Sequence, residues 1–223
     1  MFIELTEILR CPNDHPESYV VATPIVMDGR RIVRGVVGCP ECRAEYPIVD
    51  GVAYFTDARA SAARDGPARS GGLRPSEDGA PPAVAGGSIA GTPDYDAAAL
   101  ATLLNLSGPG GYAVLAGGAG RLGAALFATA PGVHLVAVNP PAGVAPSLML
   151  SVLRCPAGLP LTSASVRGVA LGADLATPPW LAEARRALLP GLRLVVEDER
   201  ASSEGLSELA RGAGLLVGEK RPV

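Results

Sequence analysis

Three cysteines in the first fifty residues constrain the fold of this chain more than any other feature. Cys39 and Cys42 form a C-x-x-C pair with a proline inside it, and Cys11 stands 28 residues earlier in a Cys-Pro dipeptide. A tight turn at this spacing points two sulfurs at one ion, and structural zinc then needs two further ligands. His15 and Asp14 both follow Cys11, and imidazole is the better zinc ligand beside thiolates. The sequence therefore favours a site of Cys11, His15, Cys39 and Cys42, with Asp14 as the alternative to His15.

Two other interpretations of these cysteines stay open. In one, the metal site has decayed and the three cysteines remain as small buried apolar residues. In the other, the C-x-x-C pair is redox-active, but that motif is expected beside a βαβ pattern, which does not surround it here.

The residues around the cysteines predict a small β-rich unit over residues 1–56. Runs rich in β-branched residues at 19–26 and 31–37 flank Asp28-Gly29, and two shorter runs within 46–55 flank Asp50-Gly51. Asp-Gly between such runs is a strong signal for a tight hairpin turn. A cysteine-bearing turn and a hairpin, each occurring twice, are the pattern of a zinc ribbon.

The remainder of the chain divides into two parts. Residues 57–91 are rich in Ala, Gly, Pro and Ser without an apolar period, which predicts a flexible linker. Residues 92–223 alternate strand-like and helix-like runs, which predicts an α/β domain with a parallel sheet covered by helices. The expected strands are 112–116, 134–138, 151–155, 166–172, 192–197 and 215–218, and the expected helices are 92–106, about ten residues from 120, 178–189 and 202–213.

The first part resembles a known family of zinc-ribbon proteins. LTEILRCP, followed by CPECRAEYPIVDGVAYF, is similar to the Trm112 family over residues 1–56. This resemblance implies a partner role, because members of that family bind and stabilise S-adenosylmethionine (SAM)-dependent methyltransferases that act on tRNA, rRNA and translation factors. Aspartate at position 14 departs from the second cysteine that is usual in the family.

The third part resembles class I SAM-dependent methyltransferases, which have a Rossmann-like parallel sheet. The resemblance rests on the glycine-rich turn in VLAGGAGRLG, on LPLTSASVRGV and on EARRALLPGLRLVV, in the family's order over about residues 95–218. It implies SAM contacts at Gly118, Gly120, Asn139 and Leu161. Glycines at such a turn let the backbone approach a cofactor closely.

Four positions depart from the pattern of an active methyltransferase. Ala116 stands where an acid usually ends the first strand, and Asn139 stands where a carboxylate usually accepts both ribose hydroxyls. Leu122 replaces the third glycine of the turn, and Ser163 replaces a loop acid. Asparagine offers neither charge nor bidentate acceptance to a diol. These departures favour a methyltransferase-like domain whose SAM site is weakened or lost.

Two functions follow from these features. One is a non-catalytic adaptor that binds and stabilises a protein partner, such as a methyltransferase or a translation-related protein. The other is an active SAM-dependent methyltransferase with an atypical cofactor site. An RNA-binding ribbon is a weaker third possibility, because the net charge of −3 gives no surplus of cations for phosphates.

The sequence also bears on the location of the protein and on two acids. No apolar run approaches the roughly 18 residues of a membrane span, and no signal peptide is expected with Glu4 and Glu7 near the start, so we expect a cytoplasmic protein. Asp174 follows the strand predicted at 166–172 and is interpreted as a solvated loop acid or a substrate contact. Glu197 ends the strand predicted at 192–197 and is interpreted as part of an exposed charged turn.

Overall fold

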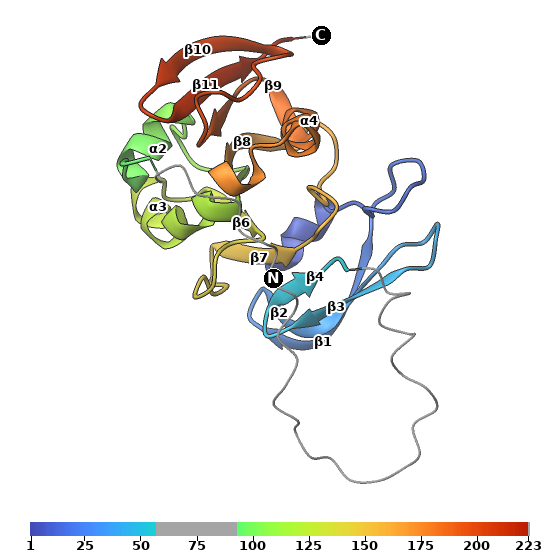
Figure 1. Cartoon of the computed structure of the whole chain (residues 1–223). Helices are drawn as coiled ribbons and strands as arrows, with labels where there is room; N and C mark the ends of the chain where they lie inside the picture. The colour runs from blue at the N-terminus through green and yellow to red at the C-terminus, as the bar shows by residue number, and fades with distance from the viewer. Residues whose placement is uncertain (57–92, 223) are drawn as a thin grey trace.

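One mixed sheet of eleven strands runs through the described part of the molecule. The computed structural model describes residues 1–56 and 93–222, so the predicted linker at 57–91 lies outside the described residues. The strands follow the order β1-β2-β3-β4-β7-β6-β5-β8-β9-β11-β10, from one end of the molecule to the other (Figure 1). Their bounds are β1 Val21–Asp28, β2 Arg31–Gly38, β3 Glu45–Val49, β4 Val52–Tyr54, β5 Tyr112–Ala116, β6 His134–Val138, β7 Leu150–Arg154, β8 Val166–Leu171, β9 Leu188–Val196, β10 Leu206–Gly212 and β11 Leu215–Lys220.

The centre of the sheet has the strand order of a doubly wound α/β fold. Strands β7, β6, β5, β8 and β9 are mutually parallel, and the chain begins this set at β5 in the middle and reverses direction across the sheet after β7. This is the 3-2-1-4-5 order of Rossmann-type sheets, in which ligands bind beyond the carboxyl ends of the strands at the point of reversal. The predicted Rossmann-like α/β fold is confirmed.

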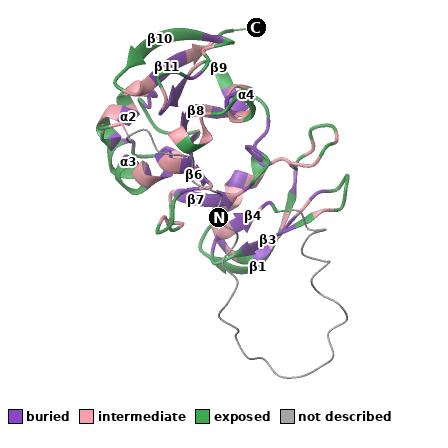
Figure 2. Ribbon diagram, in the orientation of Figure 1, coloured by how far each residue is buried: buried purple, intermediate pink, exposed green. Residues whose placement is uncertain are grey.

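Strands β5, β6, β7 and β8 and the carboxyl-terminal part of β9 bury both of their faces, as a continuous apolar run predicts. One face of the sheet packs against helices α2, Ala97–Leu103, and α3, Gly123–Thr129. The opposite face packs against α4, Pro178–Ala187, and against the amino-terminal segment that contains the 3-10 helix η1, Ile3–Glu7. The central strands are accordingly the buried part of the molecule, whereas β1 and β10 are exposed (Figure 2).

The ribbon and the Rossmann-like part are joined edge to edge. The predicted hairpins form β1–β2 and β3–β4, and the turn of the second has left-handed backbone at both Asp50 (φ 51°) and Gly51 (φ 80°). Strand β4 then pairs in parallel with β7, with Val52 opposite Val152 and Tyr54 opposite Arg154. The four ribbon strands therefore extend the central sheet across the predicted boundary between the two parts.

The end of the chain differs from the prediction, because the helix expected at 202–213 is a strand. Ala213 (φ 51°) and Gly214 (φ 77°) make a tight left-handed turn that folds β10 back onto β11 as an antiparallel hairpin. Strand β11 is itself held by antiparallel pairing with β9. The other edge of β11 offers a row of backbone groups to β10. Pairing with this edge prevails over the weak helical pattern of residues 202–213. Within β10 only Leu206 is buried.

The helices are shorter than their sequence patterns suggest. Helix α2 begins at Ala97, because the carboxylate of Asp96 accepts a hydrogen bond from the Ala99 amide at 2.8 Å and caps the helix there. The helix expected from residue 120 is divided into the 3-10 turn η2, Gly117–Leu122, and α3. The remaining 3-10 turn, η3, is Ala173–Leu175. Within the described part of the chain, no helix is long and apolar enough to cross a membrane.

Candidate functional site

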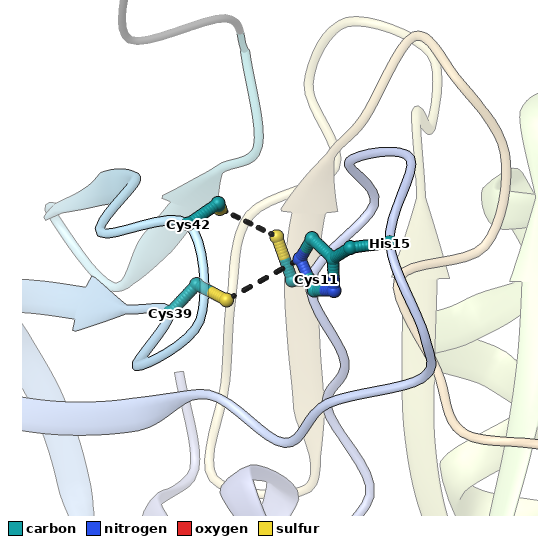
Figure 3. A group of neighbouring side chains, drawn as sticks. All are labelled: Cys11, His15, Cys39 and Cys42. Carbon is teal, nitrogen blue, oxygen red and sulfur yellow. Dashed lines mark hydrogen bonds between the residues drawn. The ribbon is translucent and has the colours of Figure 1, made fainter.

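The four predicted metal ligands lie together at the end of the ribbon. Their ligand atoms are all within 4.8 Å of one another, with Cys11 and His15 on the loop after η1 and Cys39 and Cys42 on the loop after β2 (Figure 3). Cys11 and Cys39 are buried, and Cys42 lies at the surface. Asp14 is exposed and is not part of the group, so the structure brings His15 and not Asp14 to the three sulfurs.

The spacing of these atoms fits a tetrahedral ion. Zn–S bonds of about 2.3 Å and Zn–N bonds of about 2.0–2.1 Å imply S···S edges near 3.8 Å and S···N edges near 3.6 Å in a regular tetrahedron. The Cys11 and Cys42 sulfurs are 3.7 Å apart, and the His15 Nε2 atom is 3.4 Å from the Cys39 sulfur. Three cysteine sulfurs and one histidine imidazole are also a ligand set that is common in structural zinc sites.

Neighbouring groups orient these ligands. His15 Nδ1 is 2.7 Å from the Pro16 carbonyl oxygen, so a proton on Nδ1 leaves Nε2 free to face the sulfurs. The Asn13 side chain donates to the Cys42 sulfur at 3.3 Å, and the Tyr46 hydroxyl lies 3.2 Å from the Cys11 sulfur. These contacts hold the His15 ring and the sulfurs of Cys11 and Cys42 in place.

Two of the ligand thiols, Cys11 and Cys42, differ in their readiness to ionise. Burial raises the pKa of the Cys11 thiol to about 11, despite opposing hydrogen bonds from Tyr46 and from the Asn13 backbone. For Cys42, burial also acts upward, but hydrogen bonds from the Ala44 backbone and the Asn13 side chain lower the pKa to about 6. Metal ligation needs thiolates, so an ion bound here would displace a proton from Cys11.

The loop that carries Cys11 and His15 also holds the ribbon against the Rossmann-like part. Backbone bonds join the Arg10 amide to the Pro160 carbonyl at 3.0 Å and the Thr162 amide to the Ile8 carbonyl at 2.8 Å. Between them, Leu9 pairs with Leu161 in an isolated bridge, and both leucines are fully buried. Leu161, which was expected to pack on a cofactor, therefore packs on the ribbon.

Two charged residues that flank Cys11 and His15 in the sequence, Arg10 before them and Glu17 after them, strengthen this contact. Arg10 forms an ion pair with Glu183 at 3.1 Å, and Glu183 also pairs with Arg186 at 2.9 Å. Burial acts to raise the pKa of Glu183, but the two guanidinium groups outweigh it and hold that pKa below its usual value. On the other side, the Glu17 carboxylate accepts a hydrogen bond from the Ser163 hydroxyl at 2.8 Å.

The second region of interest is the carboxyl edge, by which we mean the ends of β5, β8 and β9 with the segments that follow them. The glycine-rich turn lies here, after β5, as predicted. The Gly118 amide donates to the Asp174 carboxylate at 2.8 Å. A Cβ atom at Gly117 would stand 2.5 Å from the Asp174 carboxylate oxygens, and one at Gly118 would stand 3.2 Å from one of them. The two glycines thus make room for the Asp174 carboxylate.

Glu197 is the centre of a buried polar cluster at this edge, and the prediction of an exposed turn is wrong for this residue. It is 4% exposed, and one of its oxygens lies 2.6 Å from the Arg121 guanidinium and 2.6 Å from the Tyr95 hydroxyl. Burial, followed by the hydrogen bond to Glu197, raises the pKa of Tyr95, so the phenol stays a donor. Arg121 also donates to the Gly118 carbonyl at 3.0 Å.

Asn139 and Gly120, both predicted to contact SAM, face other parts of the chain. The Asn139 side chain donates to the Cys155 carbonyl at 2.6 Å and accepts from the Cys155 amide at 2.9 Å, which extends the pairing of β6 with β7. A Cβ atom at Gly120 would stand 2.7 Å from the Pro140 Cβ. The carboxamide of Asn139 and the space beside Gly120 are therefore already used within the fold.

The other departures from the methyltransferase pattern have structural explanations. Ala116 is fully buried in the sheet, and Leu122 packs into the core on the side of α2 and α3 instead of projecting over a cofactor position. Ser163 holds Glu17 of the ribbon.

Sequence reasoning missed the Tyr95–Arg121–Glu197 cluster and the role of Glu17. A usable signal existed for Glu197, since an acid directly after a buried parallel strand lies at the carboxyl edge, where ligands and polar clusters gather. No local pattern links Tyr95, Arg121 and Glu197, which lie far apart in the sequence.

Comparison with known proteins gives only remote similarity. No protein-family model and no curated protein matches the chain. Among solved structures, similar chains include a putative methyltransferase from an antibiotic biosynthesis pathway of Anabaena variabilis ATCC 29413 (21% identity, TM-score 0.37, 47% of this chain and 45% of that chain). Others are a putative sarcosine dimethylglycine methyltransferase from Galdieria sulphuraria (18%, 0.33, 45% and 44%) and the YcgJ protein from Bacillus subtilis (18%, 0.33, 45% and 49%). The similarity spans less than half of each of these proteins and is too weak to assign an activity.

Proposed function

We propose that this chain is a non-catalytic adaptor or stabiliser of a protein partner, built from a metal-stabilised ribbon and a Rossmann-like domain without a working SAM site. The observation that carries this proposal is the state of the carboxyl edge. The Gly118 amide is bound by Asp174, Glu197 is paired inside the fold, and Leu161 is covered by the ribbon. Three of the four residues expected to contact SAM, Gly118, Asn139 and Leu161, thus have partners within the chain, and Gly120 lies against Pro140.

The metal fits the same role. Three cysteines and His15 complete a four-ligand set, and a closed zinc site of this kind leaves no position for an activated water. Zinc bound here would stabilise the loops that carry its ligands and supply no catalysis. We therefore assign Cys11, His15, Cys39 and Cys42 to a structural zinc site.

The resemblance to the Trm112 family suggests a methyltransferase as the partner, but one edge of the ribbon sheet is already used. Strand β4 pairs with β7 of the same chain, and the loop at Arg10 packs on Pro160. The ribbon thus supports its own Rossmann-like domain, so a partner protein would bind another surface of this molecule.

Calorimetric titration of the zinc-loaded full chain with SAM and with S-adenosylhomocysteine tests the proposal. We expect no heat of binding up to millimolar ligand. The variant Asp174→Ala serves as a comparison, because it frees the Gly118 amide while leaving the Glu197 cluster in place. Micromolar binding to the wild type would refute the proposal.

Such binding would favour the second candidate, an active SAM-dependent methyltransferase. One observation supports it specifically: the glycine-rich turn lies at the reversal point of the sheet, beside an exposed carboxylate on Asp174. A ligand that displaced Asp174 from the Gly118 amide would then have access to the turn.

A further inference from the structure

One of the four cysteines is accessible to chemical modification. Cys42 lies at the surface, whereas Cys11, Cys39 and Cys155 are buried. All four belong to the described part of the chain, so Cys42 is the cysteine most accessible to a dissolved oxidant. The reactivity of a cysteine toward oxidants depends on its thiolate character and on access. A cysteine that binds zinc is a thiolate, and among the three sulfur ligands Cys42 alone also has access.

A second sulfur lies close enough to react with an oxidised Cys42. The Cys11 sulfur is 3.7 Å from it, although the two residues belong to different loops (Figure 3). A disulfide bond is about 2.05 Å long, so the two sulfurs would have to approach by about 1.7 Å. The Asn13 side chain, on the loop of Cys11, donates to the Cys42 sulfur at 3.3 Å and holds it beside that loop. Cys39 instead lies against His15, whose Nε2 atom is 3.4 Å from the Cys39 sulfur.

We infer that Cys42 is a peroxide-reactive thiolate whose oxidation product forms a disulfide with Cys11, and that this disulfide releases the zinc. In the first step the Cys42 sulfur attacks hydrogen peroxide and breaks the O–O bond, which gives a sulfenic acid and hydroxide. In the second step the Cys11 thiolate attacks the Cys42 sulfur and displaces hydroxide, so an S–S bond replaces the S–O bond. The two sulfurs lose two electrons in total, and the peroxide, with two protons from the solvent, becomes two molecules of water.

The disulfide removes two of the four zinc ligands. Structural zinc sites have four ligands, so Cys39 and His15 alone do not retain the ion. The loop of Cys11 stays bonded to the Rossmann-like part through Arg10 and Pro160, and β4 stays paired with β7. Oxidation therefore changes the metal-bound end of the ribbon and leaves its attachment in place. This inference rests on the structural zinc site proposed above, and it is independent of the partner.

Hydrogen peroxide added to the zinc-loaded full chain tests the inference. A chromogenic chelator measures the released zinc, and mass spectrometry of a non-reducing peptide digest identifies the disulfide. We expect one zinc to be released for each disulfide between Cys11 and Cys42, and we expect dithiothreitol with added zinc to restore the loaded protein. Cys155 serves as the internal control and should remain a free thiol, because it is buried and is not one of the zinc ligands.

Two matched variants each exchange one sulfur ligand for an imidazole. Cys42→His removes the surface thiol and Cys39→His removes a buried one, and both leave two cysteines and two histidines, a ligand set common in zinc sites. We expect Cys42→His to keep its zinc at a peroxide concentration that empties the wild type, because its remaining sulfur ligands are buried. We expect Cys39→His to form the same disulfide as the wild type and to release its zinc. If either variant purifies without zinc, the disulfide found in the wild type decides the question.

Three results would overturn the inference. They are zinc retention by the peroxide-treated wild type, a disulfide between Cys39 and Cys42 instead of one with Cys11, and zinc loss from Cys42→His at the wild-type rate. A chain that binds no zinc before peroxide is added would instead refute the proposed zinc site, so the two failures are distinguishable.

Discussion

Replacing Arg121 by methionine tests whether the carboxyl edge is held closed by the chain's own charges. Glu197 is 4% exposed, and Arg121 is the cation paired with it, at 2.6 Å. Removing one partner of a buried ion pair costs about 3–5 kcal/mol, because the other charge stays buried without compensation. The Arg121 side chain is 28% exposed and Tyr95 still donates to Glu197, so we expect the lower end, about 3 kcal/mol of unfolding free energy.

The double variant Arg121→Met/Glu197→Gln separates this charge effect from lost packing. Glutamine keeps an acceptor for Tyr95 but carries no charge, so we expect the double variant to recover to within about 1 kcal/mol of the wild type. The control is Arg200→Met, because Arg200 is 79% exposed and pairs with Asp198 at 3.4 Å. Exposed pairs of this kind contribute about 0–1 kcal/mol.

Urea unfolding, followed by circular dichroism and by the fluorescence of the single tryptophan, Trp180, measures these differences. A loss of about 3 kcal/mol lowers the midpoint by about 1.5 M if the denaturant slope is about 2 kcal/mol per M. Two results would refute the reasoning: Arg121→Met no more destabilising than Arg200→Met, or a double variant no more stable than Arg121→Met alone.

Three further predictions concern the metal, the ribbon contact and the glycine-rich turn. Elemental analysis should find one zinc per wild-type chain and clearly less in His15→Ala; full zinc content in that variant would exclude His15 as a ligand. The pKa of Glu183 is lowered in the folded state, so its ion pairs stabilise the fold above the unfolded value near 4.5 and are lost as pH falls through the folded pKa. Glu183→Gln should therefore lower the thermal midpoint at pH 7 and flatten its fall below about pH 4.5; equal acid sensitivity of both proteins would contradict this. Gly120→Ala should cost about 1–3 kcal/mol by overlap with Pro140. Gly38→Ala should cost much less, because its Cβ would come no closer than 3.9 Å to the Val21 carbonyl oxygen, and equal losses in chemical denaturation would disprove the steric account.

The sequence was most informative where the signal is local. The strands Tyr112–Ala116 and His134–Val138 have the bounds that their apolar runs predict, because a parallel strand buried on both faces must be apolar throughout. The cysteine pair and Cys11 similarly identify a set of side chains that the fold brings within 4.8 Å, since a tight turn places two sulfurs close together by itself. The choice of His15 over Asp14 follows from donor chemistry, and the structure places His15 accordingly.

Tertiary structure alone decided which strands pair and which side chains fill the carboxyl edge. Residues 202–213 have a weak helical pattern, yet they form β10, because β11 offers an edge whose backbone groups need partners. Strand β4 joins β7 across a sequence separation of about a hundred residues, which no local propensity encodes. For the same reason the glycines of the turn suggest a ligand site in the sequence, whereas the fold shows that Asp174 and Pro140 occupy the space they leave.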